Sequence, residues 1–359
     1  MAEKLKDRFY TPESITDTAK IFNSLYSDFD MQKFTALVLT RDFAKMEFKE
    51  KMFHTTKCLH ACLPSNYSNA IQILKKTAPK IKTAEAICLP DYVEQYGMDY
   101  WDISLDAMAW FTKFSTSEFA IRPYILKKPT DAMAYMLELT QDEDPKVRRF
   151  ASEGCRPRLP WAMAISIFKK DPSPILPILE ALKEDSSEFV RKSVANNLND
   201  ISKDHPEVVL GIAKEWLGNS EHTDWIVKHG CRTLLKAGNT NAMSLFGFLN
   251  PLDMSVSGLL TKPEIISIGD DLQFDFVIRV HKEGDVRLEY KIHYVKATGK
   301  VSNKVFKISE KTMKPGEHKV SRKHSFANLS TRKHYPGHHK IEVIINGAPK
   351  AQVGFQLKP

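Results

Sequence analysis

The feature that most constrains the fold is a helical segment that recurs along the first two thirds of the chain. DPKVRRFASEG (144–154) aligns with SEFVRKSVANN (187–197), which puts Val147 and Val190 at one position, 43 residues apart. WIVKHGCRTLLK (225–236) repeats the pattern after a further 36 residues. Because one such helix cannot bury its apolar face alone, successive copies must stack, as they do in HEAT-type repeats. The sequence therefore predicts a helical solenoid with room for about six repeats.

The segment from Pro12 to about Leu249 has apolar residues at helical spacing throughout. This spacing predicts amphipathic helices over 70–78, 103–114 and 175–184. Three dipeptides place a capping side chain before a first-turn proline and so predict helix starts: Thr11-Pro12, Asp144-Pro145 and Asp171-Pro172. The first domain is therefore expected to be mainly α and to cover residues 1–255.

Beyond about Ser257 the apolar residues alternate instead. Strands are predicted over 272–280, 286–297, 340–347 and 351–357, and Asn346-Gly347 is a strong hairpin turn. Six or seven strands in about 100 residues predict an all-β immunoglobulin-like sandwich over 258–359, without the disulfide of antibody domains. A connector over 250–258 would join the two domains.

The positive charge of the chain is concentrated in this second domain. The chain has a net charge of +8, and from Gly258 to Pro359 there are 19 Lys and Arg against 10 Asp and Glu. A basic module is typical of proteins with a polyanionic partner such as nucleic acid, although solubility alone explains part of such a charge.

The sequence also indicates where the protein works. MAEKLKDRFY has no apolar region typical of a signal peptide, and no apolar run approaches the roughly 18–20 residues that span a bilayer. Five cysteines, an odd number in a long chain, favour reduced thiols over a disulfide framework. We expect a cytoplasmic protein without membrane contact.

Helical geometry divides the first repeat helix into two faces. At 100° per residue, Val147, Phe150, Ala151 and Gly154 cluster on the side that packs. Arg149, Glu153 and Arg156 lie on roughly the opposite side. The aligned positions of the later copies are also polar or basic, which predicts a cationic stripe suited to a phosphate backbone: Lys192, Asn196, Asn199, Lys228, Arg232 and Lys236.

The same pattern has an ordinary explanation. Arg149 and Glu153 are spaced as an i,i+4 ion pair, which decorates many exposed helices. Against this, Pro157 and Pro160 predict that the helix ends near Arg156 and that another begins near Trp161. That would place an aromatic face and an ionised carboxylate at one edge of the site, where both attract cations.

Four stretches carry a family resemblance: EKLKDRFYTPE (3–13), FSTSEFAIRPYI (114–125), ASEGCRPRLPWA (151–162) and SVANNLNDISKDHP (193–206). Together they resemble the bacterial DNA alkylation repair glycosylases of the AlkC type, relatives of AlkD, in the branch with a C-terminal immunoglobulin-like domain. The resemblance covers the whole chain and is least distinctive in the first hundred residues.

The resemblance implies a monofunctional glycosylase that removes cationic N3-alkylated bases from double-stranded DNA. These are 3-methyladenine and, as a further candidate, 3-methylcytosine. It implies that no metal or other cofactor is needed. We expect a monomer, although the sequence does not fix the oligomeric state. In the carry-over, Glu153 falls on a catalytic carboxylate, Glu118 on a second acid and Trp161 on the aromatic beside the lesion, with Asp200 as a weaker match. The residues expected to contact DNA are Arg149, Arg156, Arg158, Phe119, Arg122, Arg191, Lys192, Asn196, Lys228 and Arg232.

Alkylation at N3 leaves the base cationic, so the enzyme need not protonate it. It needs negative charge beside the sugar as it becomes an oxocarbenium ion, and a positioned water. We expect Glu153 to supply the charge with help from Glu118, and Trp161 to contact the base or sugar through its π face. Loops of the basic sandwich, around Arg322-Lys323-His324 or Arg332-Lys333-His334, would reach the DNA.

Other functions fit the scaffold too. A DNA-damage sensor without catalysis would share the fold, and a protein-binding scaffold would share the repeats but has no reason to present a cationic stripe. FHTTKCLHACLP (53–64) sets His54, Cys58 and Cys62 at i, i+4 and i+8, with His60 nearby, and these residue types can bind zinc. A single helix builds a closed tetrahedral site with difficulty, so we do not expect a metal there.

Overall fold

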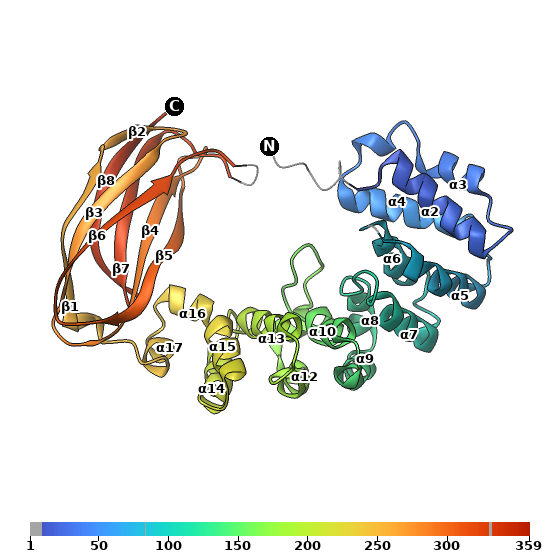
Figure 1. Cartoon of the computed structure of the whole chain (residues 1–359), viewed down its shortest axis with the longest axis horizontal. Helices are drawn as coiled ribbons and strands as arrows, with labels where there is room; N and C mark the ends of the chain where they lie inside the picture. The colour runs from blue at the N-terminus through green and yellow to red at the C-terminus, as the bar shows by residue number, and fades with distance from the viewer. Residues whose placement is uncertain (1–8, 83, 330–331) are drawn as a thin grey trace. The chain divides into compact units, whose positions relative to one another are not determined.

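The structure is a computed structural model and describes residues 9–82, 84–329 and 332–359. Two compact units make up the chain. The first consists of Met1–His205 with Trp216–Gly230, and the second of Pro206–Glu215 with Cys231–Pro359. The predicted combination of a helical repeat scaffold and an all-β sandwich is confirmed (Figure 1).

The first unit is built from helices that follow one another in chain order (Figure 1). These are α2 (Pro12–Leu25), α3 (Met31–Val38), α4 (Phe48–His60), α5 (Tyr67–Thr77), α6 (Cys88–Tyr96), α7 (Trp101–Phe111), α8 (Ile121–Lys127), α9 (Pro129–Glu138), α10 (Pro145–Gly154), α11 (Ser166–Lys170), α12 (Leu176–Leu182), α13 (Glu188–Ile201) and α15 (Glu221–Gly230). Single 3-10 turns lie at η1 (Phe43–Lys45), η2 (Ala78–Lys80), η3 (Ala84–Ile87), η4 (Leu139–Gln141) and η5 (Ser173–Ile175).

Two of the predicted helix starts have the expected caps. The Thr11 hydroxyl accepts a hydrogen bond from the Ser14 amide, and the Asp144 carboxylate accepts one from the Lys146 amide. The Asp171 carboxylate instead accepts from the Ser173 amide at the start of the short turn η5, and the next α-helix begins only at Leu176. The two full caps fix where α2 and α10 begin.

The helical repeat is visible in a contact that two aligned arginines share. Arg148 donates to the carbonyls of Asp142 and Glu143, and Arg191, 43 positions later, donates to those of Asp185 and Ser186. Arg148 also grips the Asp185 carboxylate of the next repeat through Nε at 2.6 Å and Nη2 at 2.9 Å. Each arginine therefore closes the turn before its own helix.

The apolar face predicted for α10 is its packed face. Val147, Phe150 and Ala151 are fully buried, and α10 packs on α13, which packs on α15. At Gly154 a Cβ would lie 2.9 Å from both Ile121 Cγ2 and Met136 Cε, so only glycine allows this approach. Close packing of these apolar residues therefore joins α10 to the neighbouring helices.

Three details differ from the prediction. The next helix after α10 begins at Ser166, so Trp161 lies in an irregular loop, because the Pro157 carbonyl accepts from the Ile165 amide and closes that loop. The third repeat breaks after Gly230, so that Arg232 and Lys236 lie in a separate helix of the second unit. The expected connector 250–258 is already strand from Met254 onward.

The second unit contains α14 (Pro206–Trp216) up to Glu215, α16 (Arg232–Ala237), α17 (Thr240–Leu245), η6 (Pro251–Asp253) and the sandwich. Its strands are β1 (Met254–Lys262), β2 (Ile265–Ser267), β3 (Asp271–Val280), β4 (Gly284–Val295), β5 (Val301–Met313), β6 (Gly316–Ser325), β7 (Gly337–Ile345) and β8 (Ala348–Lys358). They form one sheet of order β1-β3-β6 and another of order β2-β8-β7-β4-β5.

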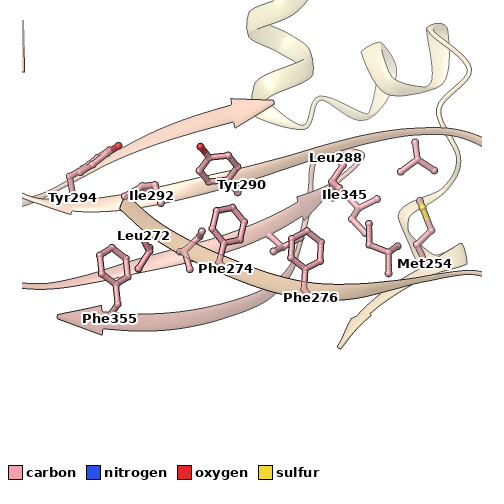
Figure 2. Close-up of a cluster of buried hydrophobic side chains, with 14 of the residues drawn as sticks. Met254, Leu272, Phe274, Phe276, Leu288, Tyr290, Ile292, Tyr294, Ile345 and Phe355 are labelled. Atoms are coloured by element: carbon pink, nitrogen blue, oxygen red, sulfur yellow. The ribbon is translucent and has the colours of Figure 1, made fainter. Parts of the chain in front are cut away.

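Alternate residues of these strands fill the space between the two sheets. Phe274 and Phe276 of β3 face Leu288, Tyr290 and other residues of β4 in one buried cluster (Figure 2). The predicted hairpin joins β7 to β8, with Asn346 at φ 46° and Gly347 at φ 78°, as a two-residue turn of this type requires.

The segment before the sandwich packs within the second unit. The Asn346 amide donates to the Leu249 carbonyl at 2.8 Å, and a Cβ on Gly238 would meet the Gly347 carbonyl oxygen at 2.6 Å. The two domains are predicted to divide between residues 255 and 258, which lie near the start of β1. The second compact unit begins earlier and includes Cys231 onward. None of the helices in the described part of the chain is both long and apolar enough to span a bilayer.

Candidate active site

The site is built on α10, where the sequence predicted it. The Asp144 cap and Pro145 start this helix, and the chain leaves it after Gly154. Glu153 therefore sits in the last turn, where α10 packs on α13. Its side chain is only 6% exposed, so it is a buried carboxylate and not a surface ion-pair partner.

One guanidinium joins the two glutamates. Arg149 Nη1 donates to Glu118 Oε1, and Arg149 Nη2 lies 3.5 Å from Glu153 Oε1. The guanidinium carbon also lies 4.4 Å from the ring centroid of Phe189, which shields its outer side. The predicted i,i+4 pair is present, but it is part of a three-residue cluster that brings Glu118 and Glu153 together.

Glu153 is fixed by two further donors. Arg156 Nη1 donates to Glu153 Oε1 at 2.6 Å, and Ser193 Oγ of α13 donates to Glu153 Oε2 at 2.7 Å. Arg156 Nε in turn donates to Asp200 Oδ2 at 2.9 Å, and Lys203 Nζ to Asp200 Oδ1 at 3.0 Å. Both oxygens of Glu153 therefore accept hydrogen bonds, one from a guanidinium and one from a hydroxyl.

Glu118 differs from Glu153 in its surroundings. It is 2% exposed, and burial raises the pKa of its carboxyl while the nearby Arg149 cation opposes that rise. Within the described residues, its second oxygen, Oε2, is buried and has no hydrogen-bond partner. Glu118 thus has one oxygen, Oε2, that could accept a further hydrogen bond, whereas both oxygens of Glu153 already accept one.

Arg122 is predicted to contact DNA, but its guanidinium is buried within the protein. It is 0% exposed and donates from Nε to the Met163 carbonyl at 2.6 Å. Nη1 donates to the Gly154 carbonyl at 3.0 Å and Nη2 to the Arg156 carbonyl at 2.9 Å. Burial lowers the pKa of Arg122 to about 10. These three hydrogen bonds from Arg122 fix both ends of the loop between α10 and α11.

Trp161 stands out from that loop. Its side chain is 63% exposed and its φ is 65°, a left-handed conformation that is rare for a residue other than glycine. Its carbonyl accepts a hydrogen bond from Lys49 Nζ of α4. The same ammonium lies 4.8 Å from the centroid of the Phe119 ring, so Lys49 contacts both the Trp161 backbone and the Phe119 ring.

The other predicted DNA contacts differ in how far their side chains are exposed. Lys192 and Lys228 are exposed, although Lys192 lies 2.7 Å from Glu188, while Asn196 and Arg232 are half-buried. Arg158 forms a two-pronged pair with Asp204 at 2.6 Å, and Arg191 donates to the carbonyls described above. Arg156 is 7% exposed and forms ion pairs with Glu153 and Asp200. Arg156, Arg158 and Arg191 are thus engaged within the protein.

One of the two sandwich segments expected to reach DNA lies within a strand. Arg322, Lys323 and His324 lie in strand β6 rather than in a loop. His324 is buried between the hydroxyls of Tyr290 at 2.9 Å and Tyr294 at 2.8 Å, and burial lowers its pKa to about 4. It is therefore a neutral core residue.

Known proteins resemble this chain over nearly its whole length. Residues 70–234 match the model of the DNA alkylation repair enzyme family, and residues 255–359 match that of the C-terminal Ig-like domain of the uncharacterised protein YhaZ. The uncharacterized protein YhaZ of Bacillus subtilis is 45% identical over 349 residues, covering 97% of this chain and 98% of YhaZ. The alkylpurine DNA glycosylase AlkC of Pseudomonas fluorescens, solved bound to DNA containing an abasic site analog, is 35% identical. That structure superposes with a TM-score of 0.95 over 99% of this chain and 100% of its own.

The chain belongs to the AlkC-type DNA alkylation repair enzymes. The family resemblance seen in the sequence motifs is therefore confirmed, including the immunoglobulin-like branch.

Sequence reasoning did not identify three residues that contribute to this AlkC-type site. Ser193 binds Glu153 from the neighbouring repeat, Phe189 covers Arg149, and Lys49 reaches Trp161 across 112 residues. Ser193 and Phe189 lie within the aligned repeat, so a closer comparison of the copies would have placed them beside α10. Nothing in the sequence around Lys49 distinguishes it from other helix lysines.

Three of the residues considered for zinc make ordinary hydrogen-bond contacts in this AlkC-type fold. His54 Nε2 lies 2.9 Å from the Leu37 carbonyl oxygen, and Cys58 Sγ lies 3.7 Å from the same nitrogen. His60 Nδ1 lies 3.0 Å from the Tyr92 hydroxyl. Across the described ranges, no three His, Cys, Asp or Glu side chains converge in a way that would hold a metal ion.

Proposed function

We propose that the chain is a monofunctional DNA glycosylase that hydrolyses the N-glycosidic bond of cationic N3-alkylated bases in double-stranded DNA. We name 3-methyladenine as the first substrate and 3-methylcytosine as a further candidate. The observation that carries the proposal is the pair of buried glutamates, Glu118 and Glu153, on one guanidinium beside an exposed tryptophan. The relative from Pseudomonas fluorescens is an alkylpurine glycosylase bound to an abasic site analog, and an abasic site is what base removal leaves.

The proposed reaction needs negative charge more than acid catalysis. When the bond between sugar C1′ and the base nitrogen breaks, its electron pair goes to the base, which departs neutral because it began as a cation. The sugar becomes an oxocarbenium ion, which carboxylates stabilise. The oxygen of a water molecule then bonds to C1′, and one of its protons passes to a carboxylate.

The two glutamates differ in the way that these roles require. Glu153 is held by Arg156 and Ser193, so we assign it the fixed negative charge beside the sugar. Glu118 retains an oxygen without a hydrogen-bond partner among the described residues, so we assign it the positioning of water. Asp200 acts through Arg156 and is a positioning residue rather than a catalytic one.

The remaining residues serve binding. The exposed indole of Trp161 would contact the cationic base or its sugar, an interaction of about 0.5–2 kcal/mol. Lys192 and Lys228 are exposed cations on successive repeats and would contact phosphates. A damage sensor or a protein scaffold would need neither the buried glutamate pair nor a water-binding oxygen.

The test is release of methylated bases from methylated duplex DNA under single-turnover conditions. We expect Glu153→Gln to lower the rate on the order of 100-fold, because it removes charge without changing shape. Trp161→Ala is expected to lower it about tenfold. Glu143→Gln removes an exposed charge just before α10 and serves as the matched control.

The outcomes separate the alternatives. If the wild-type protein binds methylated DNA but releases no base above the spontaneous rate, it is a damage-binding protein. If it releases base and Glu153→Gln retains the full rate, the catalytic assignment is wrong although the family is right.

A further inference from the structure

The loop that carries Trp161 has a strained point at the tryptophan itself. Its φ of 65° is unfavourable for an L-residue, and such a conformation persists only where neighbouring groups fix it. Arg122 fixes the two ends of the loop, at Gly154, Arg156 and Met163. The backbone of Trp161 lies between these points and is held by a different residue.

That residue is Lys49, in the first turn of α4. Its ammonium donates to the carbonyl oxygen of Trp161, 112 positions later in the chain. The ammonium also lies 4.8 Å from the centroid of the Phe119 ring. Phe119 follows Glu118 directly, so one cation contacts both the tryptophan loop and the segment that carries a site glutamate.

Two acidic side chains of α6, Asp91 and Glu94, lie within electrostatic reach of this ammonium. Burial raises the pKa of Asp91 to about 6 and that of Glu94 to about 7, and the Lys49 cation lowers both. Gln95 Nε2 donates to Asp91 Oδ2 at 2.6 Å, and Asp91 Oδ1 is buried without a partner among the described residues. A cation is therefore favoured at this point, and Lys49 supplies it.

We propose that Lys49 is a positioning residue for Trp161: it anchors the carbonyl of Trp161 against Phe119 and so sets where the indole projects from its loop. The assignment rests on the proposed function for its effect on base release. The placement of the indole can be measured without any substrate.

The placement is measured by 19F NMR of protein labelled with 5-fluorotryptophan. The chain has five tryptophans, and Trp161→Phe identifies the resonance of position 161. We expect Lys49→Met, which keeps the aliphatic stem, to shift or broaden that resonance alone. Lys57→Met is the matched control, because it removes an exposed charge from the same helix.

The same variants are then assayed for base release from methylated duplex DNA. We expect Lys49→Met to lose tenfold or more in single-turnover rate, with thermal unfolding close to that of Lys57→Met. Lys49→Arg keeps a cation and a donor and is expected to recover most of the rate. If Lys49→Arg is as defective as Lys49→Met, the anchoring explanation is lost.

The two proposals fail in different ways. A Trp161 resonance that is unchanged in Lys49→Met would overturn the positioning role whatever the activity. A resonance that moves while base release stays at the wild-type rate overturns it as well. If the wild-type protein releases no base but the resonance moves, the proposed function fails and the anchoring of Trp161 by Lys49 is supported.

Discussion

At the scale of single residues, Arg122 and Arg149 show how two similar side chains serve different ends. Arg149 joins two carboxylates at the edge of the site, whereas Arg122 is fully buried and donates only to backbone carbonyls. A guanidinium suits both tasks because its planar fork offers several donors in fixed directions. The first task concerns chemistry, and the second concerns the shape of the loop that carries Trp161.

We predict that Arg122→Lys destabilises the protein by about 3 kcal/mol, because one ammonium cannot satisfy three carbonyls spread around a fork. Denaturant unfolding measures the loss. DNA binding gives the control: its dependence on salt should be unchanged, since the Arg122 guanidinium is buried and donates to three backbone carbonyls. A flatter salt dependence with normal stability would restore the DNA contact that the sequence suggested.

Glu153 shows what residue-level pattern can and cannot predict. The helical period correctly places it on the face away from Val147 and Phe150. The period does not reveal that this face is covered, because Ser193 comes from the next repeat and Arg156 from beyond the helix end. The angle around one helix follows from the sequence, whereas burial depends on neighbouring elements.

At the scale of elements, α6 carries two carboxyl groups whose ionisation opposes folding. Burial raises the pKa of Glu94 from 4.5 to about 7 and that of Asp91 from 3.8 to about 6. The folded state thus binds protons more tightly than the unfolded state. Stability from these groups is present at low pH and is lost as the pH rises through the folded pKa values.

We therefore predict that Glu94→Gln stabilises the protein at pH 8 and has little effect at pH 4. The expected gain is on the order of 2 kcal/mol, after allowance for partial solvent screening. Urea unfolding at several pH values measures it. A gain of equal size at both pH values would show that the side chain acts through packing rather than through charge.

Sequence periodicity predicts some elements of this fold and not others. The helices over 70–78 and 103–114 and the strands of the sandwich follow from periodicity, as does the Asn346-Gly347 turn. The loop from Cys155 to Ile165 does not, because its course depends on hydrogen bonds from Arg122 and Lys49, distant in sequence. The break after Gly230 likewise interrupts a pattern that looks continuous.

At the scale of the whole molecule, the charge pattern gives a binding prediction. Lys192 and Lys228 are exposed on successive repeats of the first unit. If each contacts a phosphate, Lys228→Ala should lower the slope of log affinity against log salt by about 1. Lys192→Ala should lower it similarly.

Fluorescence anisotropy with labelled duplex DNA between about 50 and 200 mM salt measures these slopes. Lys20→Ala is the control, because this exposed lysine lies in α2 and is paired with Asp17 at 2.8 Å. Slopes that fall equally in all three variants would indicate a diffuse effect of net charge rather than two phosphate contacts.

The guanidinium that Glu118 and Glu153 share has a consequence for how the site can change. Removing either carboxylate leaves Arg149 free to pair more closely with the other, so the energetic effects of the two substitutions are coupled and do not add. Variation at one glutamate alters the selective value of variation at the other. The three side chains therefore evolve, and must be redesigned, as a single unit.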